Sequence, residues 1–321
     1  MTAKRTKLGL VGARGYVGRE LMRLVGGHPG LELNFASSRE LAGQPVAEYV
    51  PGADPELHFE NLGVDEVAQR EVDVCVLALP NGLSDDYVAK LDDGKTIVID
   101  LSGDHRFSDD WHYGLPELTR DQQQDRHWIS NPGCYATAMQ LALAPLADFL
   151  DEPPHCFGVS GYSGAGTKPS KKNDAAVLAD NLLPYQPIGH LHEREVSHRL
   201  GTEVRFFPHV AEFFRGISMT VTMTLAKSMM HGDIRMMYQR CYANEPLIRI
   251  TDETPLVAGA AGKHHATVGG WQLSADGRRL VVFATLDNLL KGAATQAIQN
   301  INLACGQREL EGLSDELSME Q

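Results

Sequence analysis

The sequence predicts two domains: a doubly wound α/β domain with a parallel sheet, followed by an α+β domain with a largely antiparallel sheet. In the first half, Val72–Leu79 (VDVCVLAL) and Thr96–Leu101 (TIVIDL) are continuous apolar runs separated by helical segments. Such runs are typical of parallel strands that are buried on both faces. In the second half, Gly216–Ala226 alternates polar and apolar residues, and Ser274–Gly277 is a hairpin turn. Alternation and hairpins indicate an antiparallel sheet with one covered face.

The first domain begins with a strand, a helix and a second strand. Leu8–Val11 is a short apolar strand, and Leu31–Ala36 is the second. The helix between them carries apolar residues at helical spacing and ends at Gly26 and Gly27. Its apolar residues are Val17, Leu21 and Leu24.

The second half supplies a hairpin and its covering helix. Ala266–Leu273 and Arg279–Leu286 flank the turn, and Met229–Asn244 is the expected helix. A last helix, about Leu289–Ala304, is expected to return to the first domain. We place the boundary near Asp151, where Pro153 and Pro154 follow. This gives a first domain of residues 1–150 with 287–321 and a second domain of 151–286.

Composition limits the class of protein. The chain has 321 residues, 43% of them hydrophobic, and a net charge of −13. An acidic chain repels phosphate backbones, so no nucleic-acid partner is expected. No apolar run approaches the roughly 18 residues of a membrane helix, and the N-terminus does not have the pattern of a signal peptide. The five cysteines are scattered, without a C-x-x-C pair, which favours a reducing cytoplasm.

A glycine-rich turn joins the first strand to the first helix. Glycines recur as G-x-x-G-x-x-G at Gly12, Gly15 and Gly18, a variant of the dinucleotide fingerprint of Rossmann-like domains. Glycine allows the backbone to approach a pyrophosphate, and the helix N-terminus attracts it. A tight turn without a ligand is the alternative. The predicted cofactor-binding residues here are Gly12, Arg14, Gly15, Tyr16 and Val17.

The end of the second strand favours NADP over NAD. An NAD enzyme places Asp or Glu there for the ribose hydroxyls. This chain has Ser37, Ser38 and Arg39 instead. Two hydroxyls and a guanidinium suit a 2′-phosphate. An N-capping serine and an exposed arginine are the alternative interpretation.

Cys134 is the candidate nucleophile. The segment 129–137 (ISNPGCYAT) leads from a strand end through Asn-Pro-Gly into a helix. Cys134 is therefore expected at the helix N-terminus, where the dipole and the N–H groups favour a thiolate. A buried, inert cysteine is the alternative. We assign that role to the other four, which are Cys75, Cys156, Cys241 and Cys305.

Histidines provide the candidate acid or base. His190 and His192 open a short predicted helix, and either could serve Cys134. They could also bind a metal, but no third ligand has suitable spacing, so no metal is predicted. His264 and His265 are expected to lie in a solvated loop before the hairpin.

Motifs along most of the chain resemble those of the N-acetyl-gamma-glutamyl-phosphate reductase family. The most specific one is Ser130–Tyr135 (SNPGCY). The other segments, in the family's order, are Gly12–Gly18, Asp100–Arg106, Gly161–Gly166, Gly189–Glu195, Phe207–His209, Arg215–Ile217 and Asp287–Ala294.

The resemblance implies a reaction and a set of site residues. The family reduces N-acetyl-gamma-glutamyl phosphate with NADPH to the semialdehyde and phosphate, a step of arginine biosynthesis. It implies Cys134 as nucleophile and His190 as general acid/base. The implied substrate-binding residues are Ser102, Arg106, Asn131 and Arg215, and the further cofactor-binding residues are Ser163, Gly164 and Asn288. It also implies a homo-oligomer, a dimer or a tetramer, with the alternating strand Ile217–Leu225 as a candidate interface.

Two segments depart from the family pattern. Thr167–Lys172 stands where an arginine often follows Ser-Gly-Ala-Gly, and Glu193–Glu195 stands where many members have Pro-Glu in the histidine motif. Both variants resemble the reductase domain of fungal bifunctional enzymes. They leave open which side chains bind the acetyl-amino end of the substrate.

Other functions remain possible from the sequence. Aspartate-semialdehyde dehydrogenase uses related chemistry, although the SNPGCY motif argues against it. N-acetyl-aminoadipyl-phosphate reductase acts on a substrate one methylene longer, a difference worth only about 1–3 kcal/mol. A non-enzymatic NADP-sensing protein would use Cys134 and His190 for packing alone. A cysteine hydrolase would leave the predicted NADP site unexplained.

Overall fold

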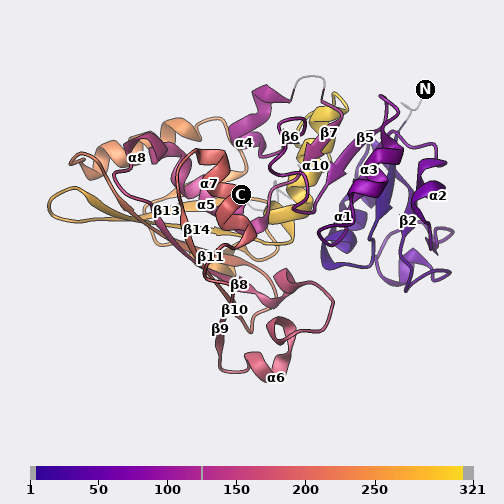
Figure 1. Ribbon diagram of the computed structural model, residues 1–321, viewed down its shortest axis with the longest axis horizontal. Helices are drawn as coiled ribbons and strands as arrows, with labels where there is room; N and C mark the ends of the chain where they lie inside the picture. The colour runs from indigo at the N-terminus through magenta and orange to yellow at the C-terminus, as the bar shows by residue number, and fades with distance from the viewer. Residues whose placement is uncertain (1–4, 124–125, 314–321) are drawn as a thin grey trace. The chain divides into compact units, whose positions relative to one another are not determined.

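The chain folds into two compact units (Figure 1). The structure, a computed structural model, describes residues 5–123 and 126–313. Within them, the first unit comprises residues 5–132 and 293–313, and the second comprises Gly133–Gly292. Each unit contains a seven-stranded sheet within these described residues.

The sheet of the first unit is parallel and doubly wound. Its strand order is β3-β2-β1-β4-β5-β7-β6, and each neighbouring pair described runs parallel. The chain moves outward from β1 to β3 and then returns to β4, so a ligand crevice is expected at the carboxyl ends of β1 and β4. The strands are β1 (Thr6–Val11), β2 (Leu31–Ser37), β3 (Phe59–Glu60), β4 (Val74–Leu77), β5 (Ile97–Asp100), β6 (His112–Tyr113) and β7 (Trp128–Ser130).

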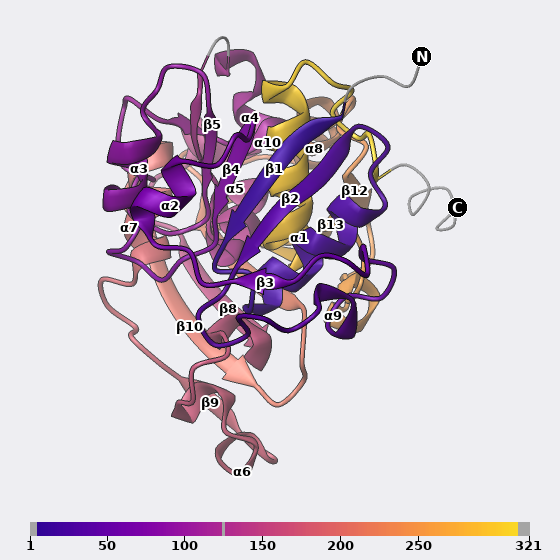
Figure 2. The same cartoon turned by 90° about the vertical axis from the view of Figure 1, so that its right-hand side faces the viewer.

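Helices cover both faces of this sheet (Figure 2). On one face lie α1 (Tyr16–Gly26) and α10 (Thr295–Ala304), which contact each other. On the other, α2 (Val64–Ala68) and α3 (Asp85–Leu91) enclose a core that includes Phe35. The short elements of this unit are α4 (Pro116–Thr119), η1 (Val46–Glu48) and η2 (Arg120–Gln122). The prediction that the last helix returns to the first domain is confirmed.

The sheet of the second unit is mixed and mostly antiparallel. Its order is β12-β13-β14-β11-β8-β10-β9, with two parallel pairs, β12 with β13 and β8 with β10. The predicted hairpin is β13 with β14, and the alternating strand β11 lies in the middle of the sheet. The strands are β8 (His155–Gly161), β9 (Leu182–Pro184), β10 (Arg205–Ala211), β11 (Ile217–Thr224), β12 (Ile248–Thr251), β13 (Ala266–Leu273) and β14 (Arg279–Leu286).

One face of this second sheet is covered by α5 (Cys134–Leu143), α7 (Leu191–Leu200) and α8 (His231–Cys241) (Figure 1). Helix α5 is almost entirely buried and packs on β11 and β14. It therefore belongs with the second unit, whereas the predicted boundary near residue 150 placed it in the first domain. The remaining elements are α6 (Ala175–Leu178), α9 (Val257–Ala260), η3 (Ala144–Phe149), η4 (Tyr162–Ala165), η5 (Lys171–Asn173) and the π-helical η6 (Leu290–Ala294).

The opposite face of the second sheet is open. Phe207, Phe157, Thr220 and Phe283 stand in register across four strands, and Phe157 is 40% exposed. Alternation along β11 buries its apolar side chains beneath α5 and leaves its threonines on this open face.

One local expectation was wrong. His264 and His265 are buried rather than solvated, with 0% and 3% of their surface exposed. The two histidines directly precede β13 of the second unit. At the start of that strand, the Ala266 N–H donates to the Leu247 carbonyl, which holds the segment against the unit. The structure describes no helix that is long and apolar enough to cross a membrane.

Candidate active site

The glycine-rich turn has the geometry that a dinucleotide needs. Gly12 has a φ of +85°, and a Cβ there would lie 2.3 Å from the Ala78 carbonyl oxygen. Gly15 is the N-cap of α1, which has no side-chain cap and no acidic residue in its first turn. Gly18 packs against the Ala13 carbonyl, where a Cβ would come within 2.6 Å of the oxygen. The turn is therefore tight, close to the sheet, and open to an anion at the helix N-terminus.

The two predicted serines are engaged with the main chain. Ser37 and Ser38 are both buried at the end of β2. The Ser37 hydroxyl accepts the Leu62 N–H at 3.3 Å, and the Ser38 hydroxyl accepts the Leu41 N–H at 3.3 Å. Both oxygens therefore shape the loop after β2, and no helix begins at Ser38 for it to cap.

The two predicted arginines of this region are more accessible. Arg39 is exposed, and Arg14 is partly buried. Arg14 forms an ion pair with Glu40, which is also exposed. Arg39 is thus the more accessible of the two for a 2′-phosphate.

Ser102, Arg106 and Asn131 come together at the carboxyl ends of β5 and β7. The Arg106 Nε donates to the Asn131 carbonyl at 3.0 Å, and one Nη donates to the Leu101 carbonyl at 3.0 Å. The Ser102 hydroxyl donates to the Asp100 carboxylate at 2.7 Å. Burial raises the pKa of Asp100 above its ordinary value. The first unit thus holds a guanidinium in place through main-chain carbonyls.

Asn131 is fixed by its own side chain. Its amide nitrogen donates to the Ala293 carbonyl at 3.3 Å, and its amide oxygen accepts the Asn300 side chain at 3.0 Å. The side chain is 1% exposed. These contacts give Asn131 a structural role in joining the end of β7 to α10 and to the segment before it.

Cys134 is the first residue of α5, as predicted. Gly133 is the N-cap, and it offers no side-chain cap. The first turn contains no acidic residue, and Cys134 is only partly buried. The α5 N-terminus is therefore available to stabilise a negative charge on sulfur.

Two neighbours fix the position of Cys134 within the second unit. The Gly133 N–H donates to the buried carboxylate of Glu195 at 3.0 Å, which ties α5 to α7. A Cβ on Gly292 would lie 2.7 Å from the Cys134 Cβ. Only glycine at position 292 leaves room for the nucleophile.

His190 is the N-cap of α7, and its ring caps that helix. The ring Nδ1 accepts the His192 N–H at 3.1 Å. The ring is 8% exposed and packs against Tyr185 and Phe206, at centroid distances of 5.6 and 5.3 Å. Burial, and then the charge of Lys172, lowers the pKa of His190 to about 4. The imidazole is therefore neutral at pH 7.

Tyr185 is a neighbour of His190 that the sequence analysis did not single out. Its ring contacts His190, and its pKa is raised by burial and then by the charge of Cys134. No local sequence pattern marks Tyr185, because it reaches the site only through the pairing of β9 with β10. Glu195, by contrast, lies in the histidine motif, and its place five residues after His190 could have identified it.

Ser163, Asn288 and Arg215 form a second cluster in this unit. The Asn288 amide donates to the Ser163 hydroxyl at 2.9 Å and accepts the Gly216 N–H at 2.7 Å. The Arg215 guanidinium pairs with the buried Asp287 carboxylate, with an Nε to Oδ2 distance of 2.5 Å. Gly164 adjoins this cluster, where a Cβ would lie 3.6 Å from the Asn288 amide nitrogen. The structure thus brings these four predicted residues together.

The other four cysteines differ from Cys134. Burial raises the pKa of Cys75 to about 12 and that of Cys305 to about 11. It also raises the pKa of Cys156 and Cys241 above the ordinary value. Among the described residues, no three His, Cys, Asp or Glu side chains form a metal-binding group.

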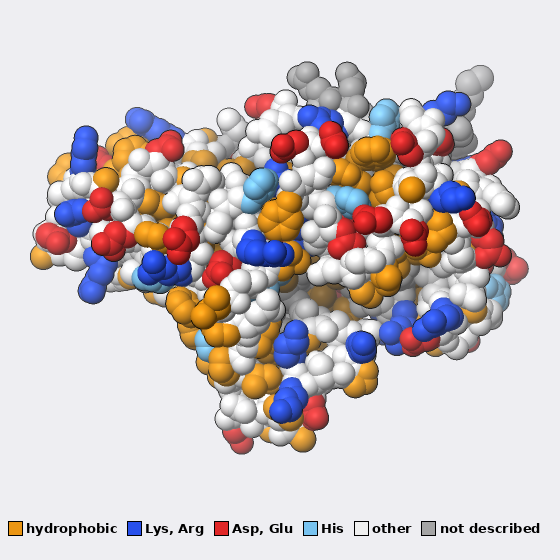
Figure 3. Space-filling view, viewed as in Figure 1, with side chains coloured by type: hydrophobic (Ala, Val, Ile, Leu, Met, Phe, Trp, Pro, Cys, Tyr) orange, Lys and Arg blue, Asp and Glu red, His pale blue; other side chains and the backbone are white. Residues whose placement is uncertain are grey.

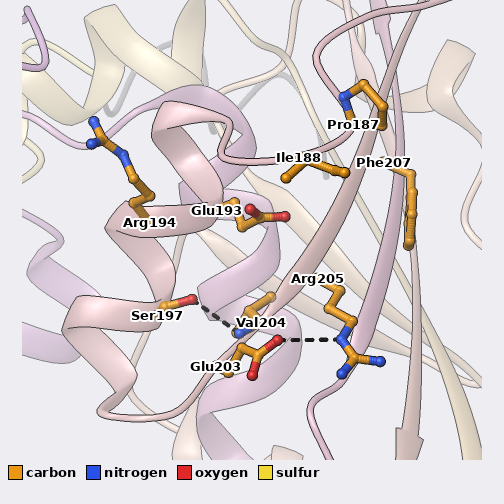
Figure 4. Close-up of a pocket in the computed structure, with 9 residues that line it drawn as sticks. All are labelled: Pro187, Ile188, Glu193, Arg194, Ser197, Glu203, Val204, Arg205 and Phe207. Carbon is orange, nitrogen blue, oxygen red and sulfur yellow. Dashed lines mark hydrogen bonds and ion pairs between the residues drawn. The ribbon is translucent and has the colours of Figure 1, made fainter.

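A pocket of about 500 Å³ lies elsewhere in the second unit (Figure 4). It is bounded by the loop before α7, by α7 itself and by the start of β10. Ile188, 85% exposed, and Phe207 form part of its wall. Neither Cys134 nor His190 lines it, so we do not assign the chemistry to this pocket.

Comparisons with known proteins agree with this geometry. Residues 7–126 match the family model of the semialdehyde dehydrogenase NAD binding domain, and residues 134–288 match that of the semialdehyde dehydrogenase dimerisation domain. The solved structure of aspartate semialdehyde dehydrogenase II complexed with ASA from Vibrio cholerae has the same fold. It is 19% identical with a TM-score of 0.76, covering 95% of this chain and 99% of that one.

Two curated relatives are much more similar in sequence. N-acetyl-gamma-glutamyl-phosphate reductase of Xanthomonas campestris pv. campestris (strain B100) is 56% identical over 312 residues, 97% of this chain and 99% of that protein. The protein of the same name from Stenotrophomonas maltophilia (strain R551-3) is 56% identical over 305 residues, 94% of this chain and 96% of that protein. The chain therefore belongs to the semialdehyde dehydrogenase family, among the N-acetyl-gamma-glutamyl-phosphate reductases.

Proposed function

We propose that this chain reduces N-acetyl-gamma-glutamyl phosphate to N-acetylglutamate 5-semialdehyde and phosphate, with NADPH, in arginine biosynthesis. The observation that carries the proposal is the position of Cys134 as the first residue of α5, beside Gly292. Identity of 56% to reductases of that name over nearly the whole chain supports the substrate.

The first unit fits a dinucleotide. Gly12 leaves the space that a side chain would fill, and α1 presents an N-terminus without an acidic residue. Arg39 supplies an exposed cation after β2, where an NAD enzyme has a carboxylate. These features support NADP, with the turn residues Gly12, Gly15 and their neighbours against the pyrophosphate.

Cys134 carries the covalent chemistry. Its thiolate attacks the carbonyl carbon of the acyl phosphate, a C–S bond forms, and the C–O bond to phosphate breaks with its electron pair leaving on phosphate. NADPH, when bound, supplies the hydride that reduces the thioester carbon. The C–S bond then breaks, which releases the aldehyde and restores the thiolate of Cys134.

His190 acts as a hydrogen-bond donor and general acid. Its Nδ1 already accepts the His192 N–H, so the proton of the neutral ring is on Nε2. An Nε2–H can stabilise the negative oxygen of the tetrahedral species, and its low pKa keeps the ring neutral in that role. To remove the proton of the Cys134 thiol, His190 would need an unprotonated Nε2, which is the opposite tautomer. The thiolate of Cys134 is therefore favoured by the N-terminus of α5 and not by His190.

The substrate is an anion at both ends, and two arginines are candidates to bind it. Arg106 is held by the main-chain carbonyls of Asn131 and Leu101, which are neutral acceptors. Arg215 is held by Asp287, whose carboxylate offsets much of that charge. We assign the phosphate to Arg106 and a hydrogen-bonding, rather than a strongly cationic, role to Arg215.

The protein is also proposed to act as a homo-oligomer in the cytoplasm. The open sheet face, with Phe157 and Phe207 both near 40% exposed, is an apolar surface suited to a second copy. It lies in the segment that matches a dimerisation domain. The free thiols of all five cysteines fit a reducing compartment.

The test is the phosphate-dependent reduction of NADP by N-acetylglutamate semialdehyde, with wild type and Cys134→Ala side by side. We expect wild-type activity that requires phosphate, and a loss of at least about a thousandfold in the variant, because covalent catalysis is removed. Activity only with the aminoadipate homologue would change the substrate. A fully active Cys134→Ala variant would refute the covalent mechanism.

A further inference from the structure

A basic turn follows the segment Gly161–Gly166 and is held in one conformation by Asn173. The Asn173 amide oxygen accepts the Ser170 N–H at 2.8 Å. Its amide nitrogen donates to the carbonyls of Gly166 and Lys168, at 2.9 and 2.8 Å. Lys and Arg side chains are visible on this part of the surface, around α6 (Figure 3). The backbone that carries the lysines of this turn is therefore held by the hydrogen bonds of Asn173.

Lys172, at the centre of η5, is directed to the histidine region. Its Nζ lies 4.6 Å from the centroid of the Tyr185 ring, in a cation–π contact. Tyr185 in turn contacts His190 edge to face, and its N–H is fixed by the Pro208 carbonyl at 3.1 Å. Lys172 is partly buried, whereas Lys171 beside it is exposed.

Lys172 has no carboxylate partner within 4.0 Å among the residues that the structure describes. Its ammonium lies over the Tyr185 ring. Arg215, the predicted substrate-binding cation of this unit, is paired with the buried Asp287. Burial and then the charge of Lys172 lower the pKa of His190, which agrees with a place for this ammonium near that ring. A partly buried ammonium on an aromatic face, without a counter-ion, is suited to an anionic ligand.

We propose that Lys172 binds the free α-carboxylate of the substrate and so helps to select an N-acylated amino dicarboxylate. This inference rests on the proposed function. The ammonium of Lys172 and the His190 imidazole both contact the Tyr185 ring, so Lys172 lies in the neighbourhood of the histidine that serves the reacting carbonyl. The substrate carries two anionic groups, the phosphate and the α-carboxylate. Because the phosphate is assigned to Arg106, the α-carboxylate is the group that remains for Lys172.

The experiment measures separate KM values for N-acetylglutamate semialdehyde and for phosphate in the NADP-reducing direction. Lys172→Met is compared with wild type, with Lys172→Arg as the conservative variant and Lys171→Met as the matched control. We expect Lys172→Met to raise the KM for semialdehyde about ten- to a hundredfold, the range for a charged hydrogen bond, without changing the KM for phosphate. Lys172→Arg should restore most of the affinity, and Lys171→Met should behave as wild type.

Three results would overturn the proposal. These are an unchanged semialdehyde KM in Lys172→Met, a rise in the phosphate KM instead, and an equal effect of Lys171→Met. Lys172→Gln, polar but uncharged, provides a second variant if Lys172→Met does not fold. A wild type that does not oxidise the semialdehyde would refute the proposed function itself, and this outcome is distinguished before any variant is compared.

Discussion

The two units each present a helix without a side-chain cap from its own N-cap residue, although in α5 the N-cap N–H donates to Glu195. Helices α1 and α5 both have glycine as N-cap, no side-chain cap, and no acidic residue in the first turn. In the first unit, the chain before α1 makes a tight turn at Gly12, with a positive φ. In the second unit, α5 carries the cysteine itself at its first position.

This difference shows how one physical feature serves two purposes. An open helix N-terminus favours a negative charge, whatever the source of that charge. Where the preceding turn has no side chain in the way, the charge is proposed to be the pyrophosphate of a bound dinucleotide. Where a cysteine occupies the first turn, the charge is proposed to be the protein's own thiolate. Helix α7 is the contrasting case, because the ring of His190 caps it and leaves a neutral imidazole.

The largest effect should come from filling the space beside Cys134. Gly292→Ala would place a Cβ 2.7 Å from the Cys134 Cβ, so the cysteine must shift. A displacement near 1 Å costs on the order of a hundredfold in rate, and kcat should fall by about that factor. Gly232→Ala in α8, where a Cβ meets nothing within 4 Å, is the control and should keep full activity. An active Gly292→Ala enzyme would mean that the α5 terminus tolerates a displaced nucleophile.

The next effect tests the turn of the first unit. Gly12→Ala combines an unfavourable φ of +85° with a Cβ 2.3 Å from the Ala78 oxygen. We expect NADPH affinity, measured by fluorescence titration, to fall about tenfold or more, because strain of roughly 1–3 kcal/mol distorts the turn. Gly52→Ala has nearly the same φ of +83° but open space around it. Equal losses in both variants would show that strain alone, not the close approach to β4, explains the effect.

A smaller effect distinguishes the thiols. At pH 7, Cys134 should react with iodoacetamide at least about tenfold faster than the other cysteines, because burial raises the pKa of each of the others. Cys241 is the sharpest comparison, since it is exposed and its pKa is raised by partial burial and by the charge of Glu245. Peptide mapping over time gives the individual rates. Equal labelling rates for Cys241 and Cys134 would show that the N-terminus of α5 does not activate the Cys134 thiol.

The smallest effect concerns the capped helix α7. The pKa of His190 is lowered from 6.5 to about 4, so its NMR titration should have a midpoint below pH 5. The folded state binds this proton less tightly than the unfolded chain does. The residue therefore contributes stability above pH 6.5 that is lost as the pH falls toward 4. Comparison with His190→Asn assigns the signal, and a midpoint near 6.5 would show that the ring is not held in its neutral, capping state.

The sequence by itself determined the architecture and the place of Cys134 at the start of a helix. Continuous apolar runs such as Val72–Leu79 can be satisfied only between two covering layers, and the alternation of Gly216–Ala226 only by a sheet with one buried face. Cys134 was placed at a helix N-terminus by the turn residues before it, because Pro and Gly restrict the local backbone. These patterns are local, so they can be interpreted without knowing the tertiary contacts of the residues.

The tertiary structure decided what surrounds those residues. Tyr185 comes near His190 because β9 pairs with β10, and Glu195 reaches Gly133 because α7 packs on α5. The burial of His264 and the ion pair of Arg215 with Asp287 also could not be predicted from the neighbouring residues in the sequence. Each depends on contacts between residues far apart in the chain, and a side chain's charge and hydrogen bonds are set by such neighbours rather than by its place in the sequence.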